Sequence, residues 1–140
     1  MQVRILSALQ GEKMIEFEWI DKNSFLISKR PVSNKQYYEF ALATNRILPV
    51  ECNDESVLAF MDDAHSFCEW AGLRLPTANE WKSSFNEFDL DFNVAEWIDD
   101  MLFGRGWIAC DAIDKIVRYD IHDFIYRLDF IGFRCVKEKK

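Results

Sequence analysis

The chain has 140 residues, of which 49% are hydrophobic and 15% aromatic, a composition that supplies a core for one domain and argues against intrinsic disorder. Its formal net charge of −7 leaves no cationic surplus to neutralise phosphates, so nucleic acid is not an expected partner. No apolar run approaches the roughly 20 residues of a membrane-spanning helix and no secretory signal is evident, so we expect no membrane association and a cytoplasmic location.

The N-terminal part of the chain predicts a hairpin. Apolar residues alternate with polar ones at Ile15, Phe17 and Trp19, which is typical of a half-buried strand within residues 13–20. A second short apolar run, residues 24–28, follows an Asp-Lys-Asn turn signal. The two runs are therefore expected to pair.

Two amphipathic helices are expected next. Ser33 is placed to cap the first, whose apolar face carries Tyr37, Phe40, Ala41 and Thr44. Residues 45–61 are interpreted as a loop around Pro49. The second helix begins near residue 62 and is expected to end at Gly72, with an apolar stripe of Ala64, Phe67, Cys68 and Ala71.

The stretch that follows has the T-x-x-E form of a capping box. Thr77 is therefore expected to cap a short helix that carries Trp81 and Phe85, with Glu80 as the reciprocal partner. Arg74 is expected to lie against Trp70 or Trp81 and to donate to backbone carbonyls, in preference to binding an anion.

The C-terminal half changes character. The pieces WIAC, KIVRYDI and FIGFRCV are short and β-prone, and Asp-rich connections separate them. Helices early and strands late predict an α+β fold. We expect a single domain over residues 1–140, in which residues 137–140 form a solvated tail.

The order of five motifs resembles the formylglycine-generating enzyme (sulfatase-modifying factor) domain family. The matching pieces are ISKRPVSNKQYYEF, MDDAHSFCEWAGLRLPTANEW, FNVAEWIDD, GRGW and IGFRCV, which run from about residue 14 to the C-terminus. The resemblance implies a C-type-lectin-like fold with two main helices, a small twisted antiparallel sheet and much irregular chain. It also implies structural roles for Arg74, Pro76, Thr77, Glu80, Trp81, Trp97 and Arg134, and pairing of Arg118, Arg127 and Arg134 with buried acids or carbonyls.

The same resemblance bears on metals. In catalytic relatives the G-N-x-x-E-W region contributes ligands to a structural calcium ion, which implies Asn93 and Glu96 as candidate ligands here. Calcium takes roughly six to eight oxygens, and the neighbouring carboxylates of Asp89, Asp91, Asp99 and Asp100 could supply more. Phe92 stands in place of the family glycine, and an acidic solvated loop is the alternative interpretation.

Whether the chain is expected to be an enzyme depends on its cysteines. Formylglycine-generating members bind copper through two cysteines, a soft site suited to Cu(I). Cys110 stands near the first of these positions, but Lys115 stands at the second, so no catalytic residue is expected. The alternative is an oxidative, copper-dependent enzyme with a rearranged site made by Cys110 and Cys135, although a lone strand cysteine is more often a small core residue.

Two further observations complete the cofactor expectations. The only histidines are His65 and His122, and both are expected at the surface, so a non-haem iron site like that of the sulfoxide synthases is not predicted. None of the four cysteines forms a C-x-x-C pair, so reduced thiols are expected rather than a disulfide framework.

The function predicted from the sequence is a non-catalytic binding or structural module for a protein or a small polar ligand. Some relatives, the variable proteins of phages and bacteria, use the late part of the domain to bind receptors, which implies a virion component or an oligomer as further possibilities. An accessory subunit of an enzyme is the other alternative. By analogy the candidate binding face spans residues 107–130 and includes Asp111, Asp114, Lys115, Tyr119, His122, Asp123, Tyr126 and Arg127.

Overall fold

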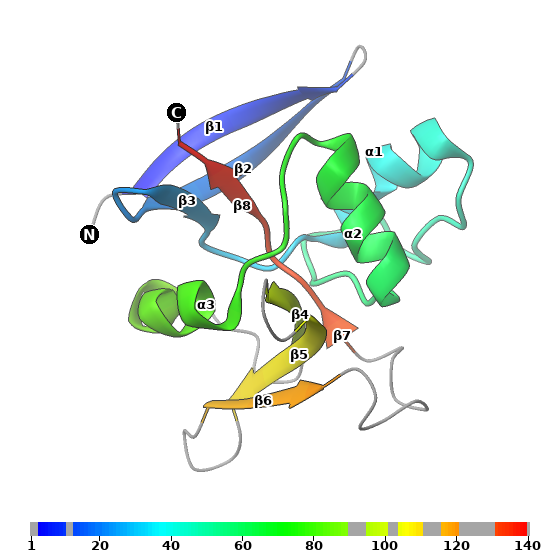
Figure 1. Ribbon diagram of the computed structural model, residues 1–140. Coiled ribbons are helices and arrows are strands. Elements are labelled where there is room, and N and C mark those ends of the chain that lie inside the picture. Colours follow the sequence, from blue (N-terminus) through cyan, green and yellow to red (C-terminus); the bar gives the residue numbers. More distant parts are fainter. Residues whose placement is uncertain are drawn as a thin grey trace.

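Two four-stranded sheets and three α-helices make up the part of the chain that the computed structural model describes (Figure 1). The described residues are 3–10, 13–89, 95–100, 104–110, 116–120 and 131–139. The predicted α+β class is confirmed. The expectation of one small antiparallel sheet is wrong, because the strands form two sheets and one pair of strands is parallel.

The first sheet has the strand order β1-β2-β3-β8 and is antiparallel throughout. Its strands are β1 (Val3–Gln10), β2 (Lys13–Asp21), β3 (Phe25–Ser28) and β8 (Val136–Glu138). The predicted hairpin is β2–β3, and the buried side chains of Ile15, Phe17 and Trp19 confirm the alternation.

The C-terminus differs from the predicted solvated tail. Lys137 and Glu138 pair with β3 as part of β8, and the Lys139 ammonium contacts the Asp21 carboxylate. The strand β1 was not predicted either. Both β1 and β8 are edge strands of the first sheet. The sequence analysis missed them because backbone pairing at an edge needs no apolar side-chain pattern.

Helix α1 (Asn34–Thr44) begins as the sequence predicts. The Ser33 hydroxyl accepts from the backbone N–H of Gln36, and the Gln36 side chain accepts from the backbone N–H of Ser33. Asn45 ends the helix in the left-handed conformation, with a φ of 60°. Tyr37, Phe40 and Ala41 are buried.

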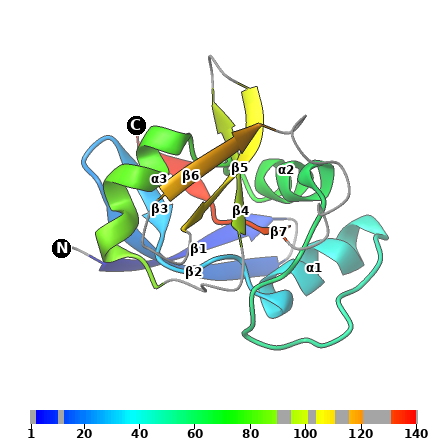
Figure 2. The same ribbon diagram turned by 90° about the horizontal axis from the view of Figure 1, so that it is seen from below.

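Helix α2 (Met61–Trp70) lies beside α1 (Figure 2). The predicted stripe of Ala64, Phe67, Cys68 and Ala71 is buried. Gly72 follows with a φ of 74°, a conformation that a residue with a Cβ rarely adopts, which explains the glycine at this turn.

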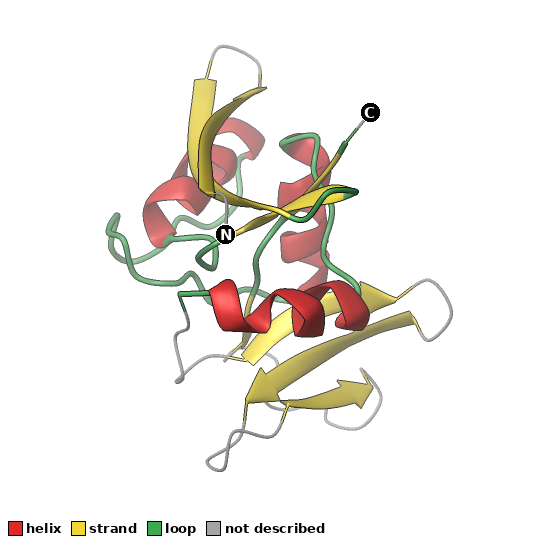
Figure 3. Ribbon diagram, turned by 90° about the vertical axis from the view of Figure 1, so that its left-hand side faces the viewer, coloured by secondary structure: helices red, strands yellow, loops and turns green. Residues whose placement is uncertain are grey.

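Helix α3 (Ala78–Ser84) lies between the two sheets and continues into a short 3₁₀ turn, η1 (Phe85–Glu87) (Figure 3). The second sheet has the order β6-β5-β4-β7, and its β4–β7 pair is the parallel one. Its strands are β4 (Ala95–Asp100), β5 (Gly104–Cys110), β6 (Ile116–Asp120) and β7 (Ile131–Gly132).

The core is aromatic. Phe67 of α2 is fully buried and packs against Tyr37 and Phe40 of α1, Phe17 of β2 and Phe133. Such ring pairs stabilise the fold by more than the burial of their apolar area alone provides.

Within the described residues, no helix combines the length and the apolar character needed to cross a bilayer.

Candidate functional site

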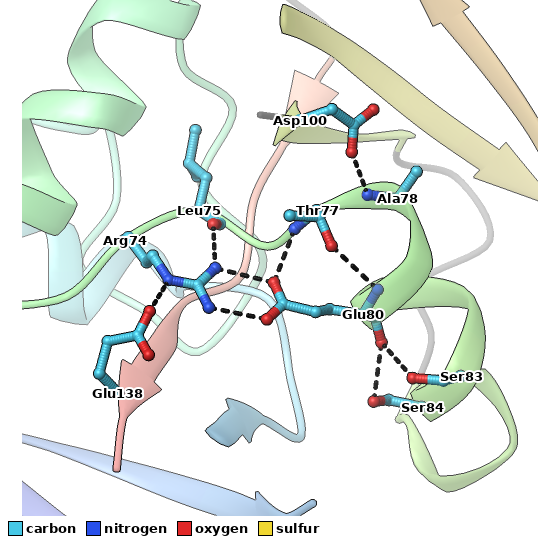
Figure 4. Close-up of polar contacts among 9 residues, drawn as sticks. All are labelled: Arg74, Leu75, Thr77, Ala78, Glu80, Ser83, Ser84, Asp100 and Glu138. Atoms are coloured by element: carbon cyan, nitrogen blue, oxygen red, sulfur yellow. Dashed lines mark hydrogen bonds and ion pairs between the residues drawn. The ribbon is translucent and has the colours of Figure 1, made fainter. Parts of the chain in front are cut away.

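The Arg-Leu-Pro-Thr corner before α3 is held by a two-point ion pair (Figure 4). Arg74 Nη1 and Nη2 donate to Glu80 Oε1 and Oε2, both at 2.7 Å, and Nε donates to the Glu138 carboxylate. Within the described residues, one bond of the guanidinium goes to a carbonyl as the sequence predicted, from Nη1 to Leu75 at 3.1 Å. Carboxylate partners satisfy a guanidinium more strongly, and they raise the pKa of Arg74.

The predicted capping box of α3 is confirmed. Thr77 Oγ1 accepts from the Glu80 backbone N–H at 3.1 Å, and Glu80 Oε1 accepts from the Thr77 N–H at 2.9 Å. The adjacent N–H of Ala78 donates to Asp100 Oδ1 at 2.6 Å. The backbone N–H groups of Thr77, Ala78 and Glu80 at the start of α3 are thus used within the scaffold.

Asp100 serves two elements. Its Oδ2 accepts from Arg118 Nε at 2.6 Å, and Arg118 Nη2 also donates to the Gly104 carbonyl at 3.0 Å. The predicted pairing of Arg118 with a buried acid is therefore confirmed. Asp99, the other suggested calcium donor of this strand, lies 3.7 Å from Arg105 Nε.

Glu96 is buried and paired. Arg134 Nε donates to Glu96 Oε1 at 2.6 Å and Nη2 donates to Oε2 at 2.9 Å, while Trp81 Nε1 donates to Oε1 at 2.9 Å. Both oxygens are occupied, so a calcium ion at Glu96 would have to compete with Arg134. Asn93, the partner ligand in that prediction, lies outside the described residues. Calcium binding stays a prediction.

Trp97 and Pro76 are tied to neighbouring segments of the fold. Trp97 is fully buried, and its Nε1 donates to the Ala59 carbonyl at 2.7 Å. The Pro76 carbonyl accepts from the Asp99 N–H at 3.0 Å, which fastens the turn to β4.

Cys135 contacts the thiol of Cys68, a neighbour that the sequence analysis did not consider. Its Sγ lies 3.6 Å from Cys68 Sγ on α2, and both side chains are buried. Burial and the neighbouring Cys135 raise the pKa of the Cys68 thiol, so it stays protonated. The Cys110 side chain is outside the described part of the chain, so a Cys110–Cys135 site stays untested.

The predicted binding face between residues 107 and 130 is described only in part. Tyr119 is half-buried, and its ring stacks on Trp107 with centroids 5.5 Å apart. The remaining candidates of this face lie outside the described residues: Asp111, Asp114, Lys115, His122, Asp123, Tyr126 and Arg127.

Within the described residues, exposed large hydrophobic side chains gather on a different surface, the connection between α1 and α2. The exposed large hydrophobic side chains of the described residues are Leu42 near the end of α1 and, in the connection itself, Ile47, Leu48, Val50, Leu58 and Phe60. Val50 and Ile47 are 102% and 93% exposed. Such a concentration of exposed apolar side chains marks an interaction surface more often than isolated ones do.

Five of these side chains, all except Leu42, line a groove of about 630 Å³, which we call the connection groove. It is lined by Asn34, Tyr37, Ile47, Leu48, Pro49, Val50, Glu51, Asn53, Glu55, Ser56, Val57, Leu58, Ala59, Phe60 and Asp63. Figure 2 shows the connection as the long segment that leaves α1 and returns to α2.

The connection is irregular but its second half is firmly tied to the scaffold. Its backbone N–H groups at Val57 and Ala59 donate to the Val32 and Ile131 carbonyls at 2.9 and 3.0 Å. Asn53 fixes the turn before them, because its Oδ1 accepts from Asn34 Nδ2 and from the Glu55 N–H. This half of the groove is therefore held in place before a partner binds, which lowers the ordering cost of binding.

The rim of the connection groove is acidic. Among the described residues, Glu51, Glu55 and Asp63 line it, and no Lys or Arg does. Arg46 lies nearby and pairs with Asp63 at 3.3 Å. Tyr37 lies at the groove, where burial and the nearby Asp63 raise its pKa to about 12, so the phenol stays neutral.

The sequence interpretation missed this groove because it treated residues 45–61 only as a loop. A signal was present. The run Ile47-Leu48-Pro49-Val50 is apolar but has neither helical nor strand periodicity, and acidic residues follow it. Apolar residues that no element can bury are candidates for a surface contact.

The chain was compared with protein-family models, curated proteins and solved structures, and nothing matches in any of the three comparisons.

Proposed function

We propose that this chain is a small, non-catalytic protein-binding module with a C-type-lectin-like fold, related to the formylglycine-generating enzyme domain. The connection groove carries the proposal. It places exposed apolar side chains on a scaffold that backbone hydrogen bonds hold in position. Irregular loops on a rigid base are a common arrangement for recognition.

The polar side chains of the family-like motifs support a scaffold role. Arg74 is engaged by Glu80, and Arg134 is engaged by Glu96. Groups that satisfy one another inside the fold are not free to bind a substrate. The buried thiol of Cys135 contacts Cys68, which leaves the alternative copper site without support from the described residues.

Cys52 offers a direct test. It is exposed, whereas Cys68 and Cys135 are buried, so a thiol-reactive photo-crosslinker on a Cys110→Ser background should label Cys52. Cys52 lies beside groove residues Glu51 and Asn53. Irradiation in extracts of the source cell should join the chain to a discrete partner, which is then purified and mixed with the chain at defined stoichiometry.

Two variants make the result specific. Leu58→Asp places a charge in the groove and should abolish both capture and reconstituted binding. Leu42→Asp changes an exposed leucine of α1 that does not line the groove, and it should leave both unchanged. Equal capture by both variants would contradict the proposal. So would tight, stoichiometric Cu(I) binding that is lost in Cys110→Ser, because it would favour the oxidative enzyme.

A further inference from the structure

We infer that the connection groove receives a protein segment with apolar anchor side chains flanked by lysine or arginine. This inference rests on the proposed function and specifies the chemistry of the partner. Two properties of the groove carry it, namely its apolar lining and the sign of the charge on its rim.

The lining fits side-chain anchors. Leu48, Leu58 and Phe60 are each exposed by between 39% and 56%, so each has one face packed on the protein and one face open. The volume of about 630 Å³ lies within the range in which proteins bury small ligands, and it can hold more than one apolar side chain. Such anchors at the centre of a contact supply most of its binding energy.

The rim fits cationic flanks. The exposed carboxylate of Glu51 accepts from Asn53 Nδ2 at 3.0 Å, a neutral donor that leaves its charge in place. Glu55 is exposed beside it, and Asp63 shares its charge with Arg46. Lysine and arginine side chains around an apolar anchor would therefore meet opposite charge at the rim, which favours association and selects against acidic partners.

The same charges disfavour two other occupants. A second copy facing the groove across a two-fold axis would bring Glu51 and Glu55 toward their own equivalents, and each chain carries a net charge of −7. An anionic membrane surface would be repelled for the same reason. A basic, apolar-anchored protein segment meets neither obstacle.

A display library of random peptides tests the inference without a known partner. Peptides are selected on the wild-type chain and depleted on Leu58→Asp, with Val50→Asp as a second groove variant because Val50 is fully exposed and its change should not disturb folding. Circular dichroism verifies that each variant is folded. We expect the enriched peptides to combine apolar anchors with Lys or Arg flanks.

A charge-reversed groove measures the rim directly. The double variant Glu51→Lys/Glu55→Lys should bind an enriched synthetic peptide about tenfold more weakly at low salt, and the difference should shrink in high salt. Glu69→Lys is the control, because Glu69 lies near the C-terminal end of α2, whereas the groove residue Asp63 lies near its N-terminal end. Glu69 does not line the groove. The Glu69→Lys variant should bind the same peptide as tightly as the wild-type chain does.

The outcomes separate the inference from the proposed function. Groove-dependent peptides that are neutral or acidic would overturn the cationic partner and leave protein binding intact. Wild-type self-association that Leu58→Asp removes would assign the groove to a second copy, and groove-dependent binding to lipid vesicles would assign it to a membrane. The absence of any groove-dependent peptide, together with failed crosslinking from Cys52, would overturn the proposed function as well.

Discussion

Arg134 and Glu96 form a buried two-point ion pair that joins the two sheets. Glu96 lies on β4 of the second sheet and accepts from Nε and Nη2 of Arg134. The remaining Nη1 of Arg134 donates to the carbonyls of Ser28, at the end of β3 in the first sheet, and Lys29 at 3.1 and 2.7 Å. The guanidinium also lies 3.7 Å from the centre of the Phe88 ring. One side chain thus fastens three segments.

Removal of Arg134 should be costly. Arg134→Met leaves the carboxylate of Glu96 buried without its cation, and the loss of one partner from a buried pair costs roughly 3–5 kcal/mol in free energy of unfolding. That loss is a large share of the stability of a small domain. Urea unfolding followed by circular dichroism measures it.

The control for Arg134 is a partly exposed arginine. Arg105 lies 3.5 Å from Asp62 and 3.7 Å from Asp99, with a side chain 40% exposed. Arg105→Met should change the free energy of unfolding by at most about 1 kcal/mol. An equal loss of unfolding free energy in the two variants would contradict the expected contribution of the Arg134–Glu96 pair to stability.

Glu80 should make the stability depend on pH. Burial raises the pKa of Glu80, but hydrogen bonds from Arg74 and Thr77 outweigh burial, and the net pKa is lowered. A carboxyl with a lowered pKa in the folded state stabilises the fold above its unfolded value of about 4.3 and loses that contribution as the pH falls through the folded value. The wild-type chain should therefore exceed Glu80→Gln in stability near neutral pH, and the gap should close in acid.

Urea unfolding of both chains between about pH 7 and about pH 3 measures that gap. Glu16→Gln, which changes an exposed glutamate of β2, should show little difference from the wild-type chain at any pH. A gap between wild type and Glu80→Gln that stays constant into acid would contradict the assigned role of the Arg74–Glu80 pair.

Local patterns predicted the helices well. Ser33 and Thr77 cap helices where their spacing to Gln36 and Glu80 indicates, because a capping box is a contact over three residues. The hairpin β2–β3 was also predicted from a local pattern, namely the alternation of apolar and polar residues around Phe17. What local patterns could not predict is pairing between distant segments, such as β8 on β3 or the parallel β4–β7 pair.

The site shows the same limit. The sequence indicated that Arg134 is structural, but its partner Glu96 lies 38 residues away and was interpreted as a calcium ligand. The alternative interpretation joined Cys135 to Cys110 and stays untested, and the fold brings Cys135 to Cys68, a contact that no local pattern indicated. Side-chain types thus indicated which residues matter, whereas the fold decides which of them meet.

Gly106 should be intolerant of any side chain. It pairs with β6, and a Cβ at this position would fall on the backbone carbonyl oxygen of Tyr119, well inside van der Waals contact. Backbone cannot move aside as a flexible side chain can, so Gly106→Ala should destabilise the fold by about 1–3 kcal/mol through overpacking.

Gly104 provides the comparison in a thermal or urea unfolding experiment. A Cβ there meets open space, but the φ of 76° is unfavourable for alanine, which costs roughly 1–2 kcal/mol. The loss of Trp107–Tyr119 stacking, followed by near-ultraviolet circular dichroism, should accompany Gly106→Ala but not Gly104→Ala. Unchanged stability and spectrum in Gly106→Ala would show that β5 and β6 are not held at this register.

The thiols should differ sharply in reactivity. Cys52 is exposed, whereas Cys68 and Cys135 are buried against each other, and burial raises the pKa of Cys68 so that little thiolate forms. Iodoacetamide at mildly alkaline pH should modify Cys52 in the folded chain and react with Cys68 and Cys135 at least about a hundredfold more slowly, since these two react only when the fold opens. Mass spectrometry of digested protein assigns each site. In urea Cys52, Cys68 and Cys135 should react alike. Alkylation of Cys68 or Cys135 at the rate of Cys52 in the native chain would contradict the packing of α2 against the C-terminal segment.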